Sequence, residues 1–309
     1  MAATALPTPL RDLRILPATD MPGLADARHL PDAEFERAWD AIILPDDLKA
    51  RLVRQAVTIL SLRPAVPFEQ LPLHGVMLLI GPPGVGKTTV ARGLADRIAQ
   101  VVGGLGDFAF IELDPHALTS SSLGRSQRAV EHLFSEVLEG QAAAGPLVVL
   151  IDEIETIATD RSQLSLETNP VDVIRAVDAA LVGLDRLARR YSNVLILATS
   201  NLEGTIDPAL RSRADFTYVV PLPDAPAREA ILRDTVGAIM GPFPGAERLL
   251  EPDAVTRVVA ASDGLDGRRL RKAVAAACSI RAAAHADPNN VTADDLVASI
   301  TEAQEADRR

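Results

Sequence analysis

Four short runs of mostly apolar residues recur along the chain, at 76–80, 108–113, 147–152 and 193–199. Each run is nearly continuous rather than alternating, which is typical of strands that are covered on both faces of a sheet. Between the runs, apolar residues recur at helical spacing, for example at 88–99 and 126–138. This alternation predicts an α/β fold with a parallel sheet and helical crossovers.

The pattern changes on both sides of this region. After residue 223 the strand-like runs stop, and alanine-rich helical segments follow; a Thr292–Asp295 capping box predicts the start of the last helix. Before residue 35, five prolines favour an irregular, extended arm. We therefore expect three parts: a proline-rich segment at 1–34, a large α/β domain at 35–223 and a small helical lid domain at 224–309.

Composition narrows the classes of function. The net charge of -11 argues against the basic surface on which DNA affinity depends, so nucleic acid is not an expected partner. A single cysteine excludes an internal disulfide framework. No signal-peptide core and no apolar run close to 18 residues is present, so we expect a cytoplasmic protein without a membrane partner.

The segment G-P-P-G-V-G-K-T at 81–88 directly follows the first apolar run and precedes a helix. Its glycines allow a tight loop whose N–H groups, together with the helix N-terminus, favour an anion. Lys87 is expected to hold the β- and γ-phosphates, and Thr88 to bind Mg²⁺. The alternative is a plain glycine turn, against which the strand–loop–helix context argues. The expected nucleotide-binding residues here are Gly81, Pro82, Pro83, Gly84, Val85, Gly86, Lys87, Thr88 and Thr89.

Polar residues end the third and fourth apolar runs. Asp152 can reach the Mg²⁺ shell, and Glu153 can polarise an attacking water as general base. Asn201 is placed to orient that water near the γ-phosphate. Each residue alone could be an ordinary strand end, but after a phosphate loop they predict hydrolysis of ATP with Mg²⁺ as cofactor.

Arg211 and Arg213 lie in I-D-P-A-L-R-S-R-A-D-F at 206–216, with no evident purpose inside their own domain. An arginine directed at the γ-phosphate of a neighbouring subunit can accelerate hydrolysis by about 10³–10⁵. An arginine that acts on a neighbouring subunit requires an oligomer. The alternative is that both residues are solvated surface arginines.

Together these motifs resemble the AAA+ ATPases, and among them the pachytene-checkpoint branch, whose members remodel HORMA-domain proteins. The resemblance extends from 38–49 to 264–272, and its most specific part is N-P-V-D-V-I-R-A-V-D-A-A-L-V-G-L-D at 169–185. It implies a homo-oligomeric, hexameric ring. It also implies that Arg213 is a trans-acting arginine finger, assisted by Arg211. Arg268, in G-L-D-G-R, would be a sensor arginine that contacts nucleotide from its own subunit. Ile42 and Ile43 would contact the adenine.

The resemblance also gives a reading of the serine-rich stretch T-S-S-S-L-G at 119–124. In this branch the corresponding loop carries an aromatic pair that grips substrate in the central pore. Ser122 and Leu123 align with that pair, and Gly124 follows, so the aromatic is absent. Leu123 can still make apolar contact, although it buries less area than an aromatic. An ordinary surface turn is the alternative, as it is for a second candidate pore loop at 160–168.

The function implied is an ATP-driven remodeller that opens or disassembles a HORMA-domain protein complex. Bacterial relatives of this branch accompany HORMA proteins and cyclic-nucleotide synthases in antiphage (CBASS) operons, where they disassemble the activating complex. The expected partner is a HORMA-domain protein bound to such a synthase, and the expected effect is negative regulation. Two alternatives remain open: another AAA+ motor, such as a DNA loader or general unfoldase, and a non-enzymatic ATP-gated scaffold.

Overall fold

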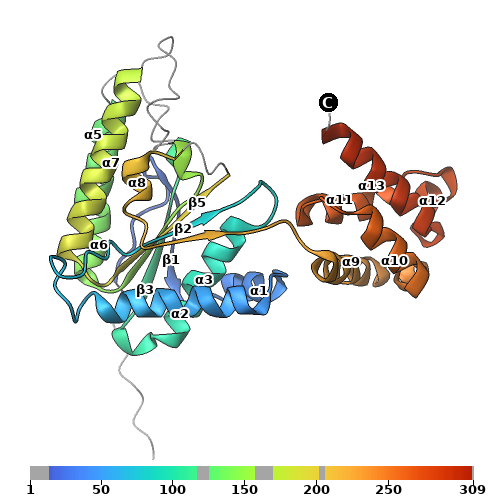
Figure 1. Cartoon of the computed structure of the whole chain (residues 1–309), viewed down its shortest axis with the longest axis horizontal. Helices are drawn as coiled ribbons and strands as arrows, with labels where there is room; N and C mark the ends of the chain where they lie inside the picture. Colours follow the sequence, from blue (N-terminus) through green and yellow to red (C-terminus); the bar gives the residue numbers. More distant parts are fainter. Residues whose placement is uncertain (1–13, 117–124, 157–169, 202–205, 308–309) are drawn as a thin grey trace, which may run out of the picture.

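The protein is described from a computed structural model, in which an α/β domain is followed by a smaller helical domain (Figure 1). The structure describes residues 14–116, 125–156, 170–201 and 206–307. Within these ranges, no helix combines the length and the apolar character that a membrane span requires.

A six-stranded sheet forms the centre of the α/β domain, with the order β1-β3-β4-β5-β2-β6. The strands from β2 to β6 are parallel, and β1 pairs antiparallel with β3 at one edge. The predicted parallel α/β fold is therefore confirmed, with a strand at each of the four apolar runs. The strands are β1 (Leu24–Leu30), β2 (Val76–Ile80), β3 (Phe108–Leu113), β4 (Leu147–Ile151), β5 (Val194–Ser200) and β6 (Phe216–Val219).

Helices cover both faces of the sheet (Figure 1). In β2, Val76, Leu78 and Ile80 pack into one buried cluster, whereas Met77 and Leu79 pack into the other. Because successive side chains of a strand point to opposite faces, a strand between two helical layers must be apolar throughout. One layer consists of α1 (Ala33–Ala41), α2 (Asp46–Leu62) and α3 (Lys87–Val101), and the other of α5 (Arg125–His132), the π-helix η2 (Leu133–Leu138), α6 (Glu139–Ala144) and α7 (Pro170–Arg190).

The helix expected at 126–138 changes type along its length. It is α-helical to His132 and a π-helix from Leu133 to Leu138. Phe134 of this wider turn lies against α7 at Gly183, where a Cβ atom would stand only 2.5 Å from the ring. The glycine thus permits the close approach of the two helices.

The expectation of an irregular arm over 1–34 is wrong for residues 24–30, which form β1. The pairing register with β3 shifts between Leu24 and Asp26. Because of this shift, Leu24 is buried in the core on one face of the sheet and Leu30 in the core on the other. The strand therefore lacks both a continuous apolar run and a regular alternation, the two patterns by which sequence reveals strands.

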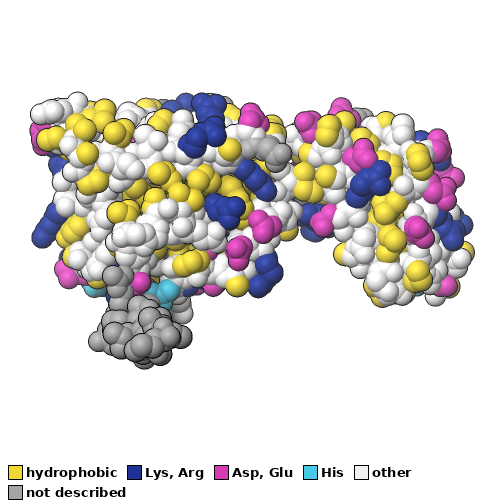
Figure 2. All heavy atoms as spheres, turned by 90° about the horizontal axis from the view of Figure 1, so that it is seen from below, with side chains coloured by type: hydrophobic (Ala, Val, Ile, Leu, Met, Phe, Trp, Pro, Cys, Tyr) yellow, Lys and Arg dark blue, Asp and Glu magenta, His cyan; other side chains and the backbone are white. Residues whose placement is uncertain are grey.

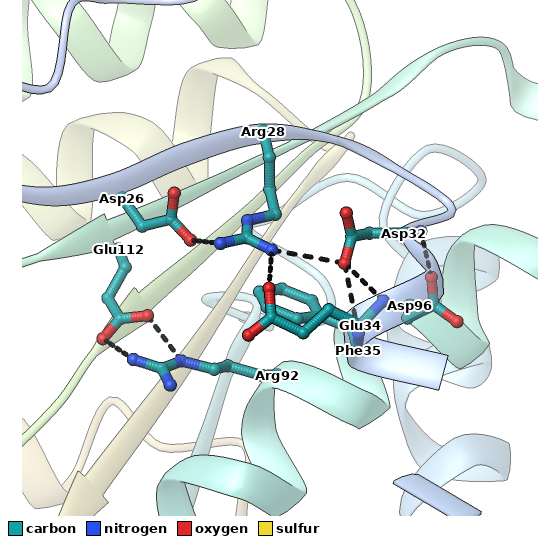
Figure 3. Close-up of polar contacts among 8 residues, drawn as sticks. All are labelled: Asp26, Arg28, Asp32, Glu34, Phe35, Arg92, Asp96 and Glu112. Atoms are coloured by element: carbon teal, nitrogen blue, oxygen red, sulfur yellow. Dashed lines mark hydrogen bonds and ion pairs between the residues drawn. The ribbon is translucent and has the colours of Figure 1, made fainter. Parts of the chain in front are cut away.

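Side-chain contacts hold β1 and the start of α1 against the sheet (Figure 3). Arg28 contacts the carboxylates of Asp26, Asp32 and Glu34 at 2.6, 3.2 and 2.9 Å. The guanidinium also lies 4.5 Å from the ring centre of Phe35. Asp32 caps α1 by accepting from the N–H groups of Glu34 and Phe35. These local contacts give the charged side chains of β1 ion-pair and aromatic partners.

The helical domain has its own apolar core, drawn mainly from α9, α11 and α13. The predicted capping box is present: the Thr292 N–H donates to Asp295 Oδ2 at 2.9 Å, and the Asp295 N–H donates to Thr292 Oγ1 at 3.4 Å. The helical lid is thus confirmed as a fold feature. Its elements are α9 (Ala225–Met240), η6 (Pro244–Leu250), α10 (Pro252–Ala261), α11 (Gly267–Ala277), α12 (Ala282–Ala286), η7 (Pro288–Asn290) and α13 (Ala293–Asp307). Three short helices complete the α/β domain: η1 (Gly103–Leu105), η3 (Ile154–Thr156) and α8 (Pro208–Arg211).

Candidate active site

The register of three neighbouring strands brings the expected site residues together. In β4 and β5, Ile151 lies beside Ala198, and in β5 and β2, Ser200 lies beside Ile80. The residues that follow each strand therefore emerge at the same edge of the sheet. Carboxyl ends of parallel strands form the usual ligand site of open α/β sheets.

The loop after β2 depends on glycine at two positions. Gly84 has φ +84° and Gly86 has φ +91°, in the left-handed region that favours glycine. A Cβ atom at Gly84 would lie 2.3 Å from the carboxylate of Asp266, and one at Gly86 would lie 2.6 Å from Ile42. The loop therefore passes closely between the lid and the segment after α1, and it leads directly into α3.

Lys87, the first residue of α3, reaches back over this loop. Its Nζ donates to the carbonyl oxygens of Gly81 at 2.8 Å and Pro82 at 2.9 Å, and to Asn201 Oδ1 at 2.8 Å. Its side chain is buried, and burial lowers the pKa of Lys87. The carboxylates nearby, led by that of Glu155, oppose this decrease in the pKa. The ammonium is thus fixed where strands β2 and β5 end.

Thr88 and Asp152 place oxygen atoms side by side. The Thr88 hydroxyl donates to Asp152 Oδ1 and Oδ2 at 2.9 and 3.1 Å. Thr199, near the end of β5, donates to the same carboxylate and accepts from the Glu153 N–H at 3.1 Å. Hydroxyl and carboxylate oxygens are the ligands that Mg²⁺ prefers, so this pair fits the expected cation.

Glu153 is fixed at both ends of its carboxylate. Oε1 accepts from Asn201 Nδ2 at 3.1 Å, and Oε2 lies 3.1 Å from Nε2 of His116. The backbone of Glu153 has φ +51°, the one positive value of a non-glycine residue in the described chain. Such a conformation costs about 1–3 kcal/mol and is typical of functional sites. Glu153 is thus held in place at some cost to the fold.

Two further residues at this edge were not predicted from the sequence. His116, beyond the end of β3, contacts Glu153. Glu155, in η3, accepts from the Asn201 N–H at 3.0 Å. A lone histidine and one more acid after Asp152 and Glu153 carry no spacing signal of their own, so only the fold reveals these contacts.

A cavity of about 460 Å³ lies between the two domains next to the phosphate loop. We call this space, together with Lys87, Asp152, Glu153 and Asn201 at the adjoining strand ends, the nucleotide cavity; these four residues do not line the space itself. Ile42 and Ile43, which follow α1, line it, as do Ile231 of the lid and Thr89 of α3. Figure 2 shows the domains as two bodies that meet at a narrow junction. The apolar residues offer a surface for a flat base, and the loop offers N–H groups for phosphates.

Arg268 enters the nucleotide cavity from the lid. It is the second residue of α11, which Asp266 caps by accepting from the Arg269 N–H at 2.9 Å. The positive charge of Arg268 helps to lower the pKa of Lys87. The structure thus places an arginine from the lid and the phosphate-loop lysine around the same space.

Arg213 is arranged differently, since it is not among the residues that line the nucleotide cavity. Its Nε and Nη2 donate to Asp185 Oδ1 and Oδ2 of α7, each at 2.7 Å, and its Nη1 donates to the Ala209 carbonyl at 2.6 Å. Arg211 ends α8 and is exposed. The expected pore-loop residues Ser122, Leu123 and Gly124, and the second loop at 160–168, lie outside the described residues.

Comparison with known proteins shows the family of the chain. Residues 77–222 match the family described as "ATPase family associated with various cellular activities (AAA)". The chain is 44% identical over 288 residues to CD-NTase-associated protein 6 of Pseudomonas aeruginosa, covering 93% of this chain and 94% of that protein. It is 34% identical over 210 residues to the putative pachytene checkpoint protein 2 of Caenorhabditis elegans, covering 67% of this chain and 49% of that protein. The chain thus spans about half the length of this relative.

Two solved structures are similar in fold. The structure of C. elegans PCH-2 has a TM-score of 0.72 at 26% identity, covering 92% of this chain and 76% of that chain. The Escherichia coli MS115-1 HORMA:CdnC:Trip13 complex gives 0.71 at 19% identity, covering 93% and 97%. The chain is an ATPase of the AAA family, and it belongs to the same family as CD-NTase-associated protein 6.

Proposed function

We propose that the nucleotide cavity binds ATP with Mg²⁺ and that hydrolysis drives the remodelling of a HORMA-domain protein. The observation that carries the catalytic part is the convergence of Lys87, Asp152, Glu153 and Asn201 at the ends of three adjacent strands. Lys87 and Asp152 contact residues of the phosphate loop, and Asn201 joins Lys87 to Glu153. This convergence supports a site that hydrolyses nucleotide as well as binding it.

The phosphates would lie along Gly81–Thr89, against the backbone N–H groups and the N-terminus of α3. Lys87 then neutralises charge at the β- and γ-phosphates. Thr88 and Asp152 would hold Mg²⁺, which supplies further neutralisation of the phosphate oxygens when bound. Ile42 and Ile43 would hold the adenine, and Arg268 would contact phosphate from the lid of the same chain.

Glu153 is the proposed general base. Asn201 donates one amide N–H to Glu153 and presents its oxygen to Lys87, so it ties the base to the phosphate-binding lysine. A carboxylate held in this way can take a proton from a water that attacks the γ-phosphate. Asn201 would orient the same water through its amide group.

Arg213 is the proposed arginine finger, which would act on the γ-phosphate of a neighbouring subunit with help from Arg211. Its described side-chain contacts are with Asp185 and the Ala209 carbonyl and not with the phosphate loop or the strand-end residues, which supports this assignment. A finger that acts in trans requires a neighbouring subunit, and we propose a homohexameric ring. The pore of that ring would hold Leu123 and its neighbours, Ser122 and Gly124.

The substrate proposal rests on relatives. The P. aeruginosa relative is named for its association with a CD-NTase, and the E. coli complex contains HORMA, CdnC and Trip13. We infer that this chain acts in the cytoplasm on a HORMA-domain protein bound to a cyclic-nucleotide synthase. By opening that complex it would negatively regulate an antiphage signalling system.

The test uses a complex of a HORMA-domain protein and its cyclic-nucleotide synthase, purified together. With ATP, wild-type protein should release the synthase from the complex, whereas Glu153→Gln should bind ATP and remain attached to the HORMA protein. The matched control is Lys87→Ala, which should neither bind ATP nor stay attached. A complex that stays intact with wild-type protein and ATP would overturn the substrate proposal, and ATPase activity stimulated by DNA would favour a DNA-associated motor instead.

A further inference from the structure

We propose that Asp185 is the positioning residue for Arg213, and that hydrolysis at the neighbouring subunit depends on it. This inference rests on the role proposed above for Arg213. Asp185 lies on α7, 28 positions before Arg213 in the chain, and no spacing signal connects the two. It is also the last residue of the segment 169–185, which the nucleotide cavity does not use.

The contact has the geometry that fixes a guanidinium most firmly. Two parallel N–H···O bonds of 2.7 Å join the Nε and Nη2 edge of Arg213 to both oxygens of Asp185. Such bidentate pairs set the direction of the guanidinium plane as well as its position. The Ala209 carbonyl accepts a third bond at 2.6 Å, so the plane is held from two sides.

The pairing leaves Arg213 able to act. A guanidinium has five N–H donors, and three of them make the contacts described here. The contacts described for this side chain leave one N–H on Nη1 and one on Nη2 to donate to phosphate oxygens. Asp185 therefore does not have to release Arg213 before the guanidinium reaches a γ-phosphate. This favours a role in which Asp185 orients Arg213 over one in which it holds Arg213 inactive.

The charge states agree with a permanent pair. The hydrogen bonds from Arg213 hold the pKa of Asp185 below its usual value, so the carboxylate stays ionised at neutral pH. His74 lies 3.4 Å from Asp185 Oδ1, and burial lowers the pKa of its imidazole. The imidazole is therefore neutral at pH 7 and does not compete with Arg213 as a cation. The charges of Asp215 and Asp185 raise the pKa of this imidazole against the effect of burial, and that of Arg213 lowers it.

The test compares full-length Asp185→Asn with wild type and with Arg213→Ala. The asparagine oxygen can still accept from one N–H of Arg213, but its NH₂ group would face the other N–H, donor against donor. The orientation of the guanidinium plane would then no longer be fixed. We expect kcat to fall by about 10²-fold, the usual effect of a small misplacement, with the Kd for ATP and the melting temperature unchanged. Asp294→Asn is the matched control, because it removes an exposed carboxylate that pairs with Arg257 in the lid, and it should hydrolyse ATP normally.

Mixed rings show on which side of the interface the defect lies. Asp185→Asn protein mixed with Glu153→Gln protein should regain turnover, because an intact base in the first then meets an intact finger in the second. If the defect were in the nucleotide cavity of the same chain, no mixed interface would be intact and no turnover would return. That result would overturn the proposal, as would wild-type or raised kcat in Asp185→Asn.

A second variant covers the case in which Asp185→Asn does not fold. Asp185→Glu keeps the charge but moves it by one methylene group, so it should also lower kcat without changing the Kd for ATP. Wild-type kcat in Asp185→Glu would contradict positioning. If Arg213→Ala itself hydrolyses ATP normally, the finger assignment is wrong; if only Arg213→Ala is impaired, the finger stands and Asp185 is not its positioning residue.

Discussion

The nucleotide cavity and the surroundings of Arg213 belong to the same chain but are assembled in different ways. The first draws residues from three strand ends and the loop before α3, beside a cavity that the lid helps to line, all within one chain. Arg213 instead faces Asp185 and Ala209, outside the cavity. The difference teaches that the residues proposed to bind ATP converge within one chain, whereas the arginine proposed as the finger is held apart from them.

The largest expected effect comes from removing the finger. Arg213→Ala should lower kcat by about 10³–10⁵, because it removes the guanidinium proposed to neutralise charge at the γ-phosphate of the neighbouring subunit. The Kd for ATP should stay near that of wild type, as measured with a fluorescent ATP analogue. The control is Arg257→Ala, which removes an exposed arginine of the lid. A Kd that rises in parallel with the loss of rate would mean that Arg213 belongs to the cavity after all.

On the cavity side, the largest effect should follow loss of the base. Glu153→Gln should lower kcat by about 10²–10⁴ with ATP still bound, as single-turnover kinetics would show. Glutamine keeps the size of the side chain and can still contact Asn201. Turnover equal to wild type would remove Glu153 from the role of base.

Arg268 separates the two regions most sharply, because it lines the cavity of its own chain and is proposed to act there. Arg268→Ala should weaken ATP binding by roughly 10- to 100-fold, the cost of about 1.5–3 kcal/mol for a hydrogen bond to a charged group. In mixed rings with Glu153→Gln, its own sites should not recover. Recovery there would place Arg268 on the trans side, with Arg213.

The smallest effect tests whether Thr199 holds Asp152 and Glu153 in position. Thr199→Val removes the hydroxyl that joins Asp152 to the Glu153 N–H and should lower kcat roughly tenfold, in line with about 1.4 kcal/mol for such a contact. Thr199→Ser keeps the hydroxyl and should restore the rate. Equal rates for the valine and serine variants would show that the hydroxyl does not order these groups.

The cavity was largely predictable from sequence because its signals are local. A phosphate loop, two acids after an apolar strand and an asparagine after the next strand each lie within a few residues of the element that positions them. The finger pair was only half predictable: Arg213 stood in a recognisable motif, but Asp185 lies 28 positions earlier. Contacts between residues far apart in the chain depend on how the helices pack against the sheet. The spacing of residues in the sequence does not indicate that packing.

The edge strand β1 shows the same limit in the fold. Its two buried leucines face opposite cores because the register shifts between Leu24 and Asp26. Neither an apolar run nor a period of two survives such a shift. The strands in the middle of the sheet had no such ambiguity, since burial on both faces makes them apolar throughout.

The unusual backbone of Glu153 has a consequence for selection. Glycine adopts φ +51° freely, so Glu153→Gly should make the fold more stable by up to about 1–3 kcal/mol while abolishing the base. A library screened for heat resistance alone would therefore enrich the inactive variant at this position. The backbone at this position thus favours glycine, whereas the proposed role as base requires glutamate.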